Sequence, residues 1–125
     1  MQIFLVIAAI LGGLSVAGGA FASHALQNQL PERAIEVFGT GVRYQMYHAL
    51  ALLVVALLLG IAKEPMTLLT VAGWAFVAGV VLFSGSLYLI SLAGIKAVGP
   101  VTPLGGLAFL IGWGCLAIAA LRFQV

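Results

Sequence analysis

The sequence has very few charged residues. Only 6% of the 125 residues are charged and 64% are hydrophobic, whereas about a quarter of the residues in a typical soluble domain carry a charge. The charged positions fall between or beside long apolar blocks; they are Glu32, Arg33, Glu36, Arg43, Lys63, Glu64, Lys96 and Arg122. This distribution excludes an ordinary soluble domain and is typical of a chain embedded in a bilayer.

Positive charge and cysteine are also scarce. The net charge of +2 supplies no basic patch of the kind that a nucleic-acid ligand requires, so we expect no nucleic-acid partner. Cys115 is the single cysteine, which excludes an intrachain disulfide and a cysteine-based zinc site. Because Cys115 lies inside an apolar block, we interpret it as a small packing residue.

Four apolar stretches are long enough to cross a membrane. A span needs about 20 residues, because a helix rises about 1.5 Å per residue and the hydrocarbon layer is about 30 Å thick. The predicted spans are residues 3–26, 44–62, 66–92 and 103–122. Each must be helical, because a lipid-exposed backbone finds no water to satisfy its amides. We therefore predict one all-α domain over residues 1–125, a bundle of four transmembrane helices.

The first span imitates a secretory signal. Ala20-Phe21-Ala22 resembles a small-residue cleavage site, but no Lys or Arg precedes the apolar run, and the run is longer than a typical signal core. We interpret it as a retained first helix.

A short amphipathic helix is predicted over residues 31–38, between the first two spans. Pro31 suits its first turn and Gly39 suits its end. At about 100° per residue, Ile35 and Phe38 share one face while Glu36 lies on the other. The segment is either an interfacial helix that lies flat on the membrane or a connector whose apolar side packs on its own protein. The pattern leaves both open.

The connections predict how the spans are arranged. A tight turn at Lys63-Glu64-Pro65 makes the second and third spans antiparallel neighbours. Thr102 is expected to cap the fourth span, with Pro103 at its first position. Both termini and the Lys63 turn then lie on one side of the membrane. The other side carries the loops around residues 27–43 and 93–102, and its slight excess of Arg and Lys favours a cytoplasmic location.

Small residues mark the faces on which these helices should pack. Lipid removes the hydrophobic drive between helices, so close backbone approach at small side chains is favoured instead. The first span places Gly13, Ala17 and Ala20 on one stripe, and the fourth places Gly105, Ala108 and Gly112 within one arc. The partner of each face is either another helix of the same chain or a neighbouring subunit.

Polar side chains concentrate toward one membrane face. The candidates come from all four spans and are His24, Arg43, Tyr44, Tyr47, His48, Ser84, Tyr88, Ser91 and Thr102. When the alternating direction of the helices is followed, these residues are expected at similar depth. Because intramembrane polar groups usually face the bundle interior, a shared polar pocket is one interpretation. The alternative is structural: serines bond between helices, tyrosines form an interfacial belt, and Arg43 reaches the headgroups.

The two histidines allow three roles. His24 and His48 could hydrogen-bond within the structure, contact a proton or ligand, or together ligate one haem. We predict no cofactor and no metal site, with bis-histidine haem as a lesser alternative. No acidic residue lies inside a span to orient a histidine, so conventional hydrolysis is not expected.

Four motifs together resemble a known family. They are Gly19-Ala20-Phe21-Ala22-Ser23-His24-Ala25-Leu26, Tyr44-Gln45-Met46-Tyr47-His48-Ala49-Leu50, Phe83-Ser84-Gly85-Ser86-Leu87-Tyr88 and Gly99-Pro100-Val101-Thr102-Pro103-Leu104-Gly105-Gly106. In this order they resemble the domain-of-unknown-function 423 family, which includes YgdD-like bacterial membrane proteins and the vertebrate transmembrane protein 256. The resemblance implies a small four-helix membrane protein with both histidines in the family pattern, and it brings no reaction, substrate or cofactor.

Two main functional hypotheses follow. The small-residue stripes and the lack of catalytic carboxylates favour a non-enzymatic bundle that associates with itself or with a larger membrane complex. The one-sided polar cluster favours a pocket for a lipid, a quinone-like molecule or a small solute, with transport as a possible activity. In either case we expect a multi-pass protein of the bacterial inner membrane.

Overall fold

The computed structural model describes residues 1–125 and contains only helices and their connections. Four helical segments are long and apolar enough to cross a membrane: Gln2–Leu26, Glu32–Ile61, Thr67–Ala93 and Lys96–Leu121. The predicted all-α membrane fold with four spans is confirmed.

The four spans are built from the following helices, and the first and third spans each contain a π-helical turn. The first span consists of α1 (Gln2–Phe21) followed by the π-helical turn η1 (Ala22–Leu26). The second is one helix, α2 (Glu32–Ile61). The third is divided into α3 (Thr67–Gly79), the π-helical turn η2 (Val80–Ser84) and α4 (Gly85–Ala93). A 3₁₀ turn, η3 (Lys96–Val98), leads into α5 (Val101–Leu121).

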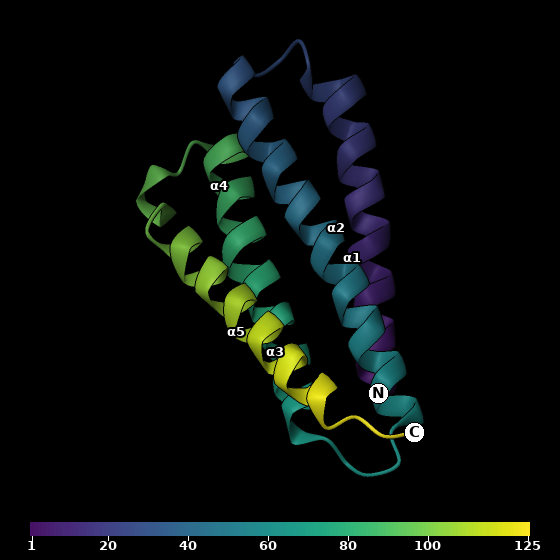
Figure 1. Ribbon diagram of the computed structural model, residues 1–125. Helices are drawn as coiled ribbons and strands as arrows, with labels where there is room; N and C mark the ends of the chain where they lie inside the picture. The colour runs from purple at the N-terminus through teal and green to yellow at the C-terminus, as the bar shows by residue number, and fades with distance from the viewer.

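Each span packs mainly on its neighbours in the chain. The pair α1–α2 lies beside the pair formed by α3–α4 and α5, and α2 joins the pairs through its contacts with α3 and α4 (Figure 1). Helices α1 and α5 are therefore the outer elements. Both termini and the turn after α2 meet at one end (Figure 1), where the amide of Lys63 donates to the carbonyl of Gln124 at 2.9 Å.

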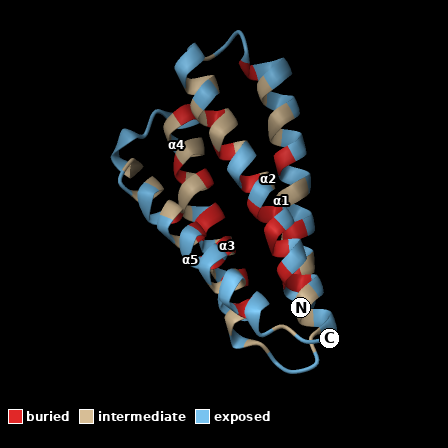
Figure 2. Cartoon of the chain, viewed as in Figure 1, coloured by how far each residue is buried: buried red, intermediate tan, exposed pale blue.

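The hydrophobic core fills the inner faces of the helices, and the outward faces remain exposed (Figure 2). Phe4, Leu52, Leu69 and Phe76 are among its most buried side chains. The ring of Phe76 lies where a side chain of Gly112 would stand, because an added Cβ there would be 2.6 Å from the ring. The small-residue face of α5 thus packs on another helix of the same chain, which is one of the two alternatives that the sequence left open.

The predicted separate amphipathic helix is wrong. Residues 31–38 do not form an independent element, because Pro31 is the N-cap of α2 and the helix continues through Gly39 to Ile61. A glycine inside a helix costs only about 1 kcal/mol, which packing easily offsets. Phe38 is buried and its ring lies 5.2 Å from that of Tyr88. The apolar side of this segment therefore packs on its own protein, and the second span begins at residue 32 instead of residue 44.

The predicted start of the fourth span is also wrong. The helix α5 begins at Val101 after Pro100, with no side-chain cap. Thr102 lies inside its first turn, and its hydroxyl bonds to the hydroxyl of Ser86 on α4. The hydroxyl of Thr102, which was predicted to cap the helix, instead joins α5 to α4.

Candidate functional site

A chain of polar contacts crosses three helices of the bundle. The hydroxyl of Tyr88 on α4 donates to the side-chain oxygen of Gln45 on α2 at 2.5 Å. The side-chain nitrogen of Gln45 donates in turn to the carbonyl of Leu11 on α1 at 2.9 Å. Because Gln45 is buried, water does not reach its side-chain amide, and these two bonds satisfy its oxygen and its nitrogen instead. These bonds hold α1, α2 and α4 in register.

A second contact joins α2 to the π-helical turn of the third span. Ser84 is fully buried, and its hydroxyl donates to the carbonyl of Gly41 at 2.7 Å. The helices can approach here because Gly41 has no side chain: an added Cβ would lie 2.8 Å from the Tyr88 ring. On the other side of η2, an added Cβ at Gly105 would lie 2.3 Å from the backbone nitrogen of Phe83. Gly105 thus lies against the π-helical turn, and Gly41 lies against the start of α4 that follows it.

Ser86 and Ser91 each donate to a backbone carbonyl three residues earlier in the third span. The hydroxyl of Ser91 donates to the carbonyl of Tyr88 at 3.3 Å, one turn earlier on the same helix. Ser86 donates to the carbonyl of Phe83 at 2.9 Å and also contacts Thr102. These groups satisfy their hydrogen bonds within the bundle.

His48 has both ring nitrogens occupied. Its Nδ1 lies 2.7 Å from the carbonyl of Tyr44, and its Nε2 accepts a hydrogen bond from the indole of Trp113 on α5 at 3.0 Å. The imidazole also stacks on the ring of Phe109, with centroids 3.5 Å apart and planes inclined by 8°. With Nδ1 protonated toward the carbonyl, Nε2 is the acceptor that the indole N–H needs. His48 therefore bridges α2 and α5.

The two histidines are not brought together. His24 lies in η1 and is exposed, and the adjacent Ser23 lines a hollow together with Gly39 of α2. His48 is nine residues further along α2, about 14 Å at 1.5 Å per residue. The expectation that the two histidines lie at the same depth is wrong. The helix α2 already begins at Glu32, so His48 lies well inside it and not near its start. No single haem is bracketed by this pair.

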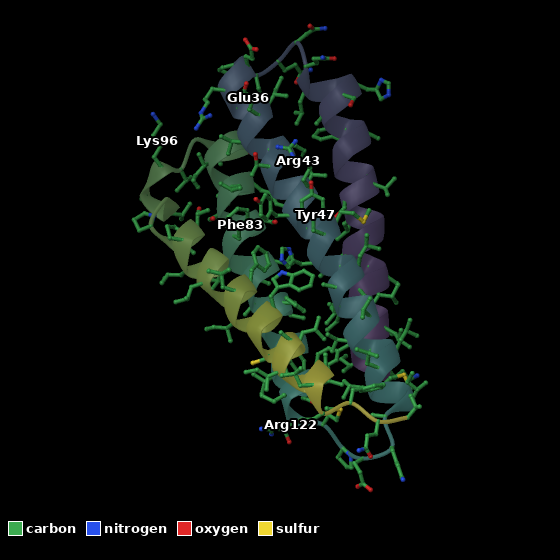
Figure 3. All side chains as sticks on the ribbon, viewed as in Figure 1. Glu36, Arg43, Tyr47, Phe83, Lys96 and Arg122 are labelled. Carbon is green, nitrogen blue, oxygen red and sulfur yellow. The ribbon has the colours of Figure 1, made fainter.

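The remaining candidates lie on the outward side of α2. Tyr44 and Tyr47 are exposed, and both line a groove of about 410 Å³ between α2 and α5. His48, Phe109 and Trp113 also line this aromatic groove, on the side of the molecule that faces the viewer in Figure 3. Arg43 lies above it, and its guanidinium donates to the hydroxyl of Thr40 at 3.1 Å.

The predicted polar residues therefore separate into three groups. The first group makes hydrogen bonds within and between the helices and consists of Ser84, Tyr88, Ser91 and Thr102. The second group, Tyr44, Tyr47 and His48, lines the aromatic groove, and the third, His24 and Arg43, lies nearer the end of the bundle. Every buried side-chain nitrogen and oxygen has a hydrogen-bond partner, and no group of three His, Cys, Asp or Glu side chains is close enough to hold a metal ion. The arrangement suits holding helices together, and it presents no nucleophile with a base.

Comparison with known proteins places the chain in a family. Residues 18–106 match the family model described as "Protein of unknown function (DUF423)". The chain belongs to this family. The UPF0382 membrane protein YwdK of Bacillus subtilis is 45% identical over 127 aligned residues, which cover 98% of this chain and 99% of the relative. The UPF0382 membrane protein SAB0533 of Staphylococcus aureus is 39% identical, with 98% of each chain covered. No solved structure matches.

The DUF423 match covers most of the site. It includes Gln45, His48 and Tyr88, whereas Leu11, which accepts from Gln45, and Trp113, which donates to His48, lie beyond it. Sequence reasoning missed both Gln45 and Trp113. Gln45 could have been found, because it is an amide inside an apolar span and lies within the Tyr44 to Leu50 motif. Trp113 lies in the middle of the fourth span, and nothing in its sequence context indicates which helix its indole faces.

Proposed function

We propose that this DUF423 protein is a non-enzymatic protein of the bacterial cytoplasmic membrane that acts by association, and that it associates with a second copy through the outward face of α1. The relatives that match along nearly the whole chain are bacterial and carry the name membrane protein, which supports this location.

The outward face of α1 carries the proposal. Gly13, Ala17 and Ala20 are exposed, and an added Cβ at Gly13 would meet nothing within 4 Å. The inner side of α1 is instead formed by Phe4, which is buried against Gly73 of α3, and by Ala8. The predicted stripe is therefore not used within the chain.

The spacing of this stripe suits a second helix. Ala9, which is also exposed, precedes Gly13 and Ala17 at intervals of four residues. Small residues at this interval let two helix backbones approach closely in a membrane, where packing and not the hydrophobic effect drives association. An outer helix that contacts little beyond α2 leaves room for such a partner.

A second copy is the occupant that symmetry favours. Copies inserted in the same direction can be related by a two-fold axis along the membrane normal, and the same face of each then meets the other. Because α1 is an outer helix, such an axis brings α1 against α1 without disturbing the rest of the bundle. The polar groups support a non-enzymatic role, since their hydrogen bonds are made within the protein.

Substitution of the small residues tests the proposal. Gly13→Ile adds a branched side chain to the stripe, and Gly114→Ile adds the same side chain to α5, where an added Cβ also meets nothing within 4 Å. We expect native mass spectrometry in mild detergent to detect a dimer for wild type and Gly114→Ile, and mainly monomer for Gly13→Ile. Equal dimer fractions in all three would contradict the proposal.

Cysteine crosslinking in membranes gives a second readout. With Cys115 replaced by alanine, Ala17→Cys is expected to form a disulfide-linked dimer under mild oxidation. Leu14→Cys is the control, because Leu14 is 58% exposed but lies to one side of the stripe. A crosslink to a different protein in place of a second copy would instead identify a larger complex and refute self-association.

A further inference from the structure

Positive charge gathers in one groove at the end of the bundle opposite the termini. Three of the five Lys and Arg residues line it: Arg33 and Arg43 on α2, and Lys96 in the turn after α4. The groove consists of two adjoining hollows of about 490 and 560 Å³ between α2 and α4. Both hollows are lined by Arg33, Val37 and Leu87, so we treat them as one cationic groove.

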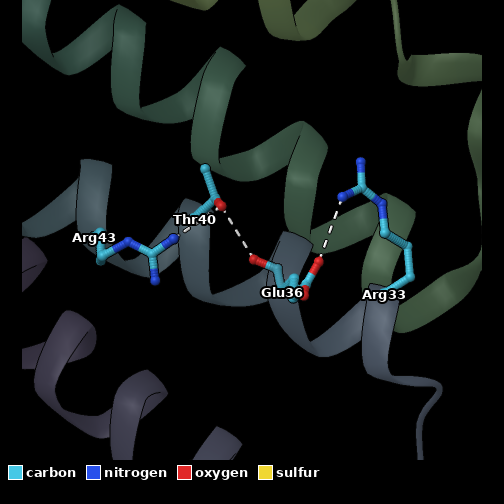
Figure 4. Close-up of polar contacts among 4 residues, drawn as sticks. All are labelled: Arg33, Glu36, Thr40 and Arg43. Atoms are coloured by element: carbon cyan, nitrogen blue, oxygen red, sulfur yellow. Dashed lines mark hydrogen bonds and ion pairs between the residues drawn. The ribbon is translucent and has the colours of Figure 1, made fainter.

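The charge of the cationic groove is only partly neutralised by the protein. The one ion pair joins Arg33 to Glu36 at 3.5 Å, and both side chains are more than half exposed. Arg43 donates to the neutral hydroxyl of Thr40 (Figure 4), and Lys96 forms no ion pair. Three cations and the single carboxylate of Glu36 leave the lining with a net charge of +2, which attracts an anion.

Apolar side chains form part of the walls of the cationic groove. Val37 and Leu87 are shared by the two hollows, and Ala34 and Ile90 extend the wall of the second. The neighbouring Glu32 lines a third hollow, on the side of α2 that faces α1, and this hollow shares Glu36 and Arg43 with the cationic groove. An anion held by the arginines and Lys96 would therefore rest beside hydrocarbon side chains.

The aromatic groove continues from the cationic groove along the same side of α2. Arg33, Thr40 and Tyr44 are spaced by seven and four residues, which places them on one face of the helix. On the third span, Leu87 lines the cationic groove and Phe83, four residues earlier, lines the aromatic groove. Lys96 and Arg43 lie nearer the end of the bundle than Tyr47 and Phe83 (Figure 3).

We propose that these two grooves together bind one anionic phospholipid, with its phosphodiester on Arg33, Arg43 and Lys96 and an acyl chain in the aromatic groove. The order of the parts matches the order in a bilayer, where the phosphate lies above the hydrocarbon. The walls of the aromatic groove are almost entirely apolar, so it accepts a hydrocarbon chain in preference to a soluble anion. A zwitterionic headgroup would add an ammonium to a lining that is already positive.

Lipid binding can be measured on the full-length protein by native mass spectrometry from mild detergent. We expect phosphatidylglycerol to bind more tightly than phosphatidylcholine with the same acyl chains. The variant R33Q/R43Q/K96Q should lose affinity for phosphatidylglycerol on the order of a hundredfold. Each basic residue near anionic lipid changes the affinity by a factor of about five, and the three factors multiply. The three side chains are exposed, so the fold does not depend on their burial.

The control variant removes the other two cations. Arg122 lies at the end of the bundle where the chain termini meet (Figure 3), and Lys63 lies there too, because its amide donates to the carbonyl of Gln124. The variant K63Q/R122Q therefore changes the net charge without touching the grooves. It should bind phosphatidylglycerol as wild type does. An equal loss in both variants, or no preference of the wild type for phosphatidylglycerol, would overturn the proposal.

Filling the aromatic groove tests the acyl chain separately. Gly106 lines this groove and an added Cβ would meet nothing within 4 Å, so Gly106→Leu should weaken binding of the long-chain lipid, while Gly114→Leu should not. Soluble glycerophosphoglycerol should compete poorly. Competition by it as effective as that of the lipid would overturn the acyl part. A co-purifying protein lost from R33Q/R43Q/K96Q with the lipid preference unchanged would overturn the whole proposal.

Discussion

The contact between Gly105 and the π-helical turn makes a sharp prediction about stability. An alanine Cβ at position 105 would lie 2.3 Å from the backbone nitrogen of Phe83 and 2.7 Å from its Cα. Real Cβ atoms do not approach this closely, and the obstacle is backbone, which cannot rotate away as a side chain can. α5 must therefore move away from η2, and its contacts with α3 and η2 must loosen.

Overpacking of this kind typically costs about 1–3 kcal/mol, and Gly105→Ala should fall in the upper part of that range because both obstructing atoms are main chain. A loss of about 2 kcal/mol changes the ratio of folded to unfolded protein about 30-fold. Gly106→Ala is the matched control, since it adds the same methyl group to the next residue of α5, where nothing lies within 4 Å. The free energy of unfolding in mixed micelles should fall for Gly105→Ala alone. Equal stability of the two variants would refute the close approach of α5 to η2.

Three further predictions concern the polar groups and the direction of insertion. Tyr88→Phe removes the bond to Gln45 and should lower the free energy of unfolding by about 0.6 kcal/mol and by no more than about 1.7 kcal/mol, the average and the maximum for such bonds in membranes; an unchanged unfolding curve would mean that the bond contributes nothing. The protein purified from haem-replete cells should lack a Soret band, because His48 is bonded through both ring nitrogens; a Soret band that disappears in His48→Ala would contradict this assignment. Alkaline phosphatase fused after Val125 should be active and green fluorescent protein fused there dark, because the end with Arg33, Arg43 and Lys96 is expected in the cytoplasm; the reverse pattern would invert the topology.

The number and type of the spans could be predicted because the bilayer imposes them. A run of about 20 apolar residues has no alternative to a helix in hydrocarbon. The tight turn at Lys63-Glu64-Pro65 likewise left one arrangement for its flanking helices. The same reasoning failed at Gly39, because a local preference for ending a helix is small beside the packing of Phe38 and Gly41 on Tyr88.

The candidate site was predicted only in part. Residue type identified Ser84 and Tyr88 as polar groups within a span, but it could not assign Gln45 as their neighbour or say that Leu11 supplies a carbonyl. The depth of His24 relative to His48 depended on where α2 begins, and that boundary was misplaced by twelve residues. The wrong start of this one helix is therefore the reason why the sequence pattern placed His24 and His48 together, whereas the structure separates them.

The sequence by itself determined that this protein crosses the membrane four times and that its polarity is concentrated toward one end, because both follow from the order of apolar and polar residues along the chain. Only the tertiary structure decided which faces meet. Gly105 and Gly112 pack within the chain while Gly13 faces outward, although all three lie in similar small-residue patterns. The physical reason is that small side chains permit close approach without choosing a partner, and the choice depends on the shapes of all the helices together.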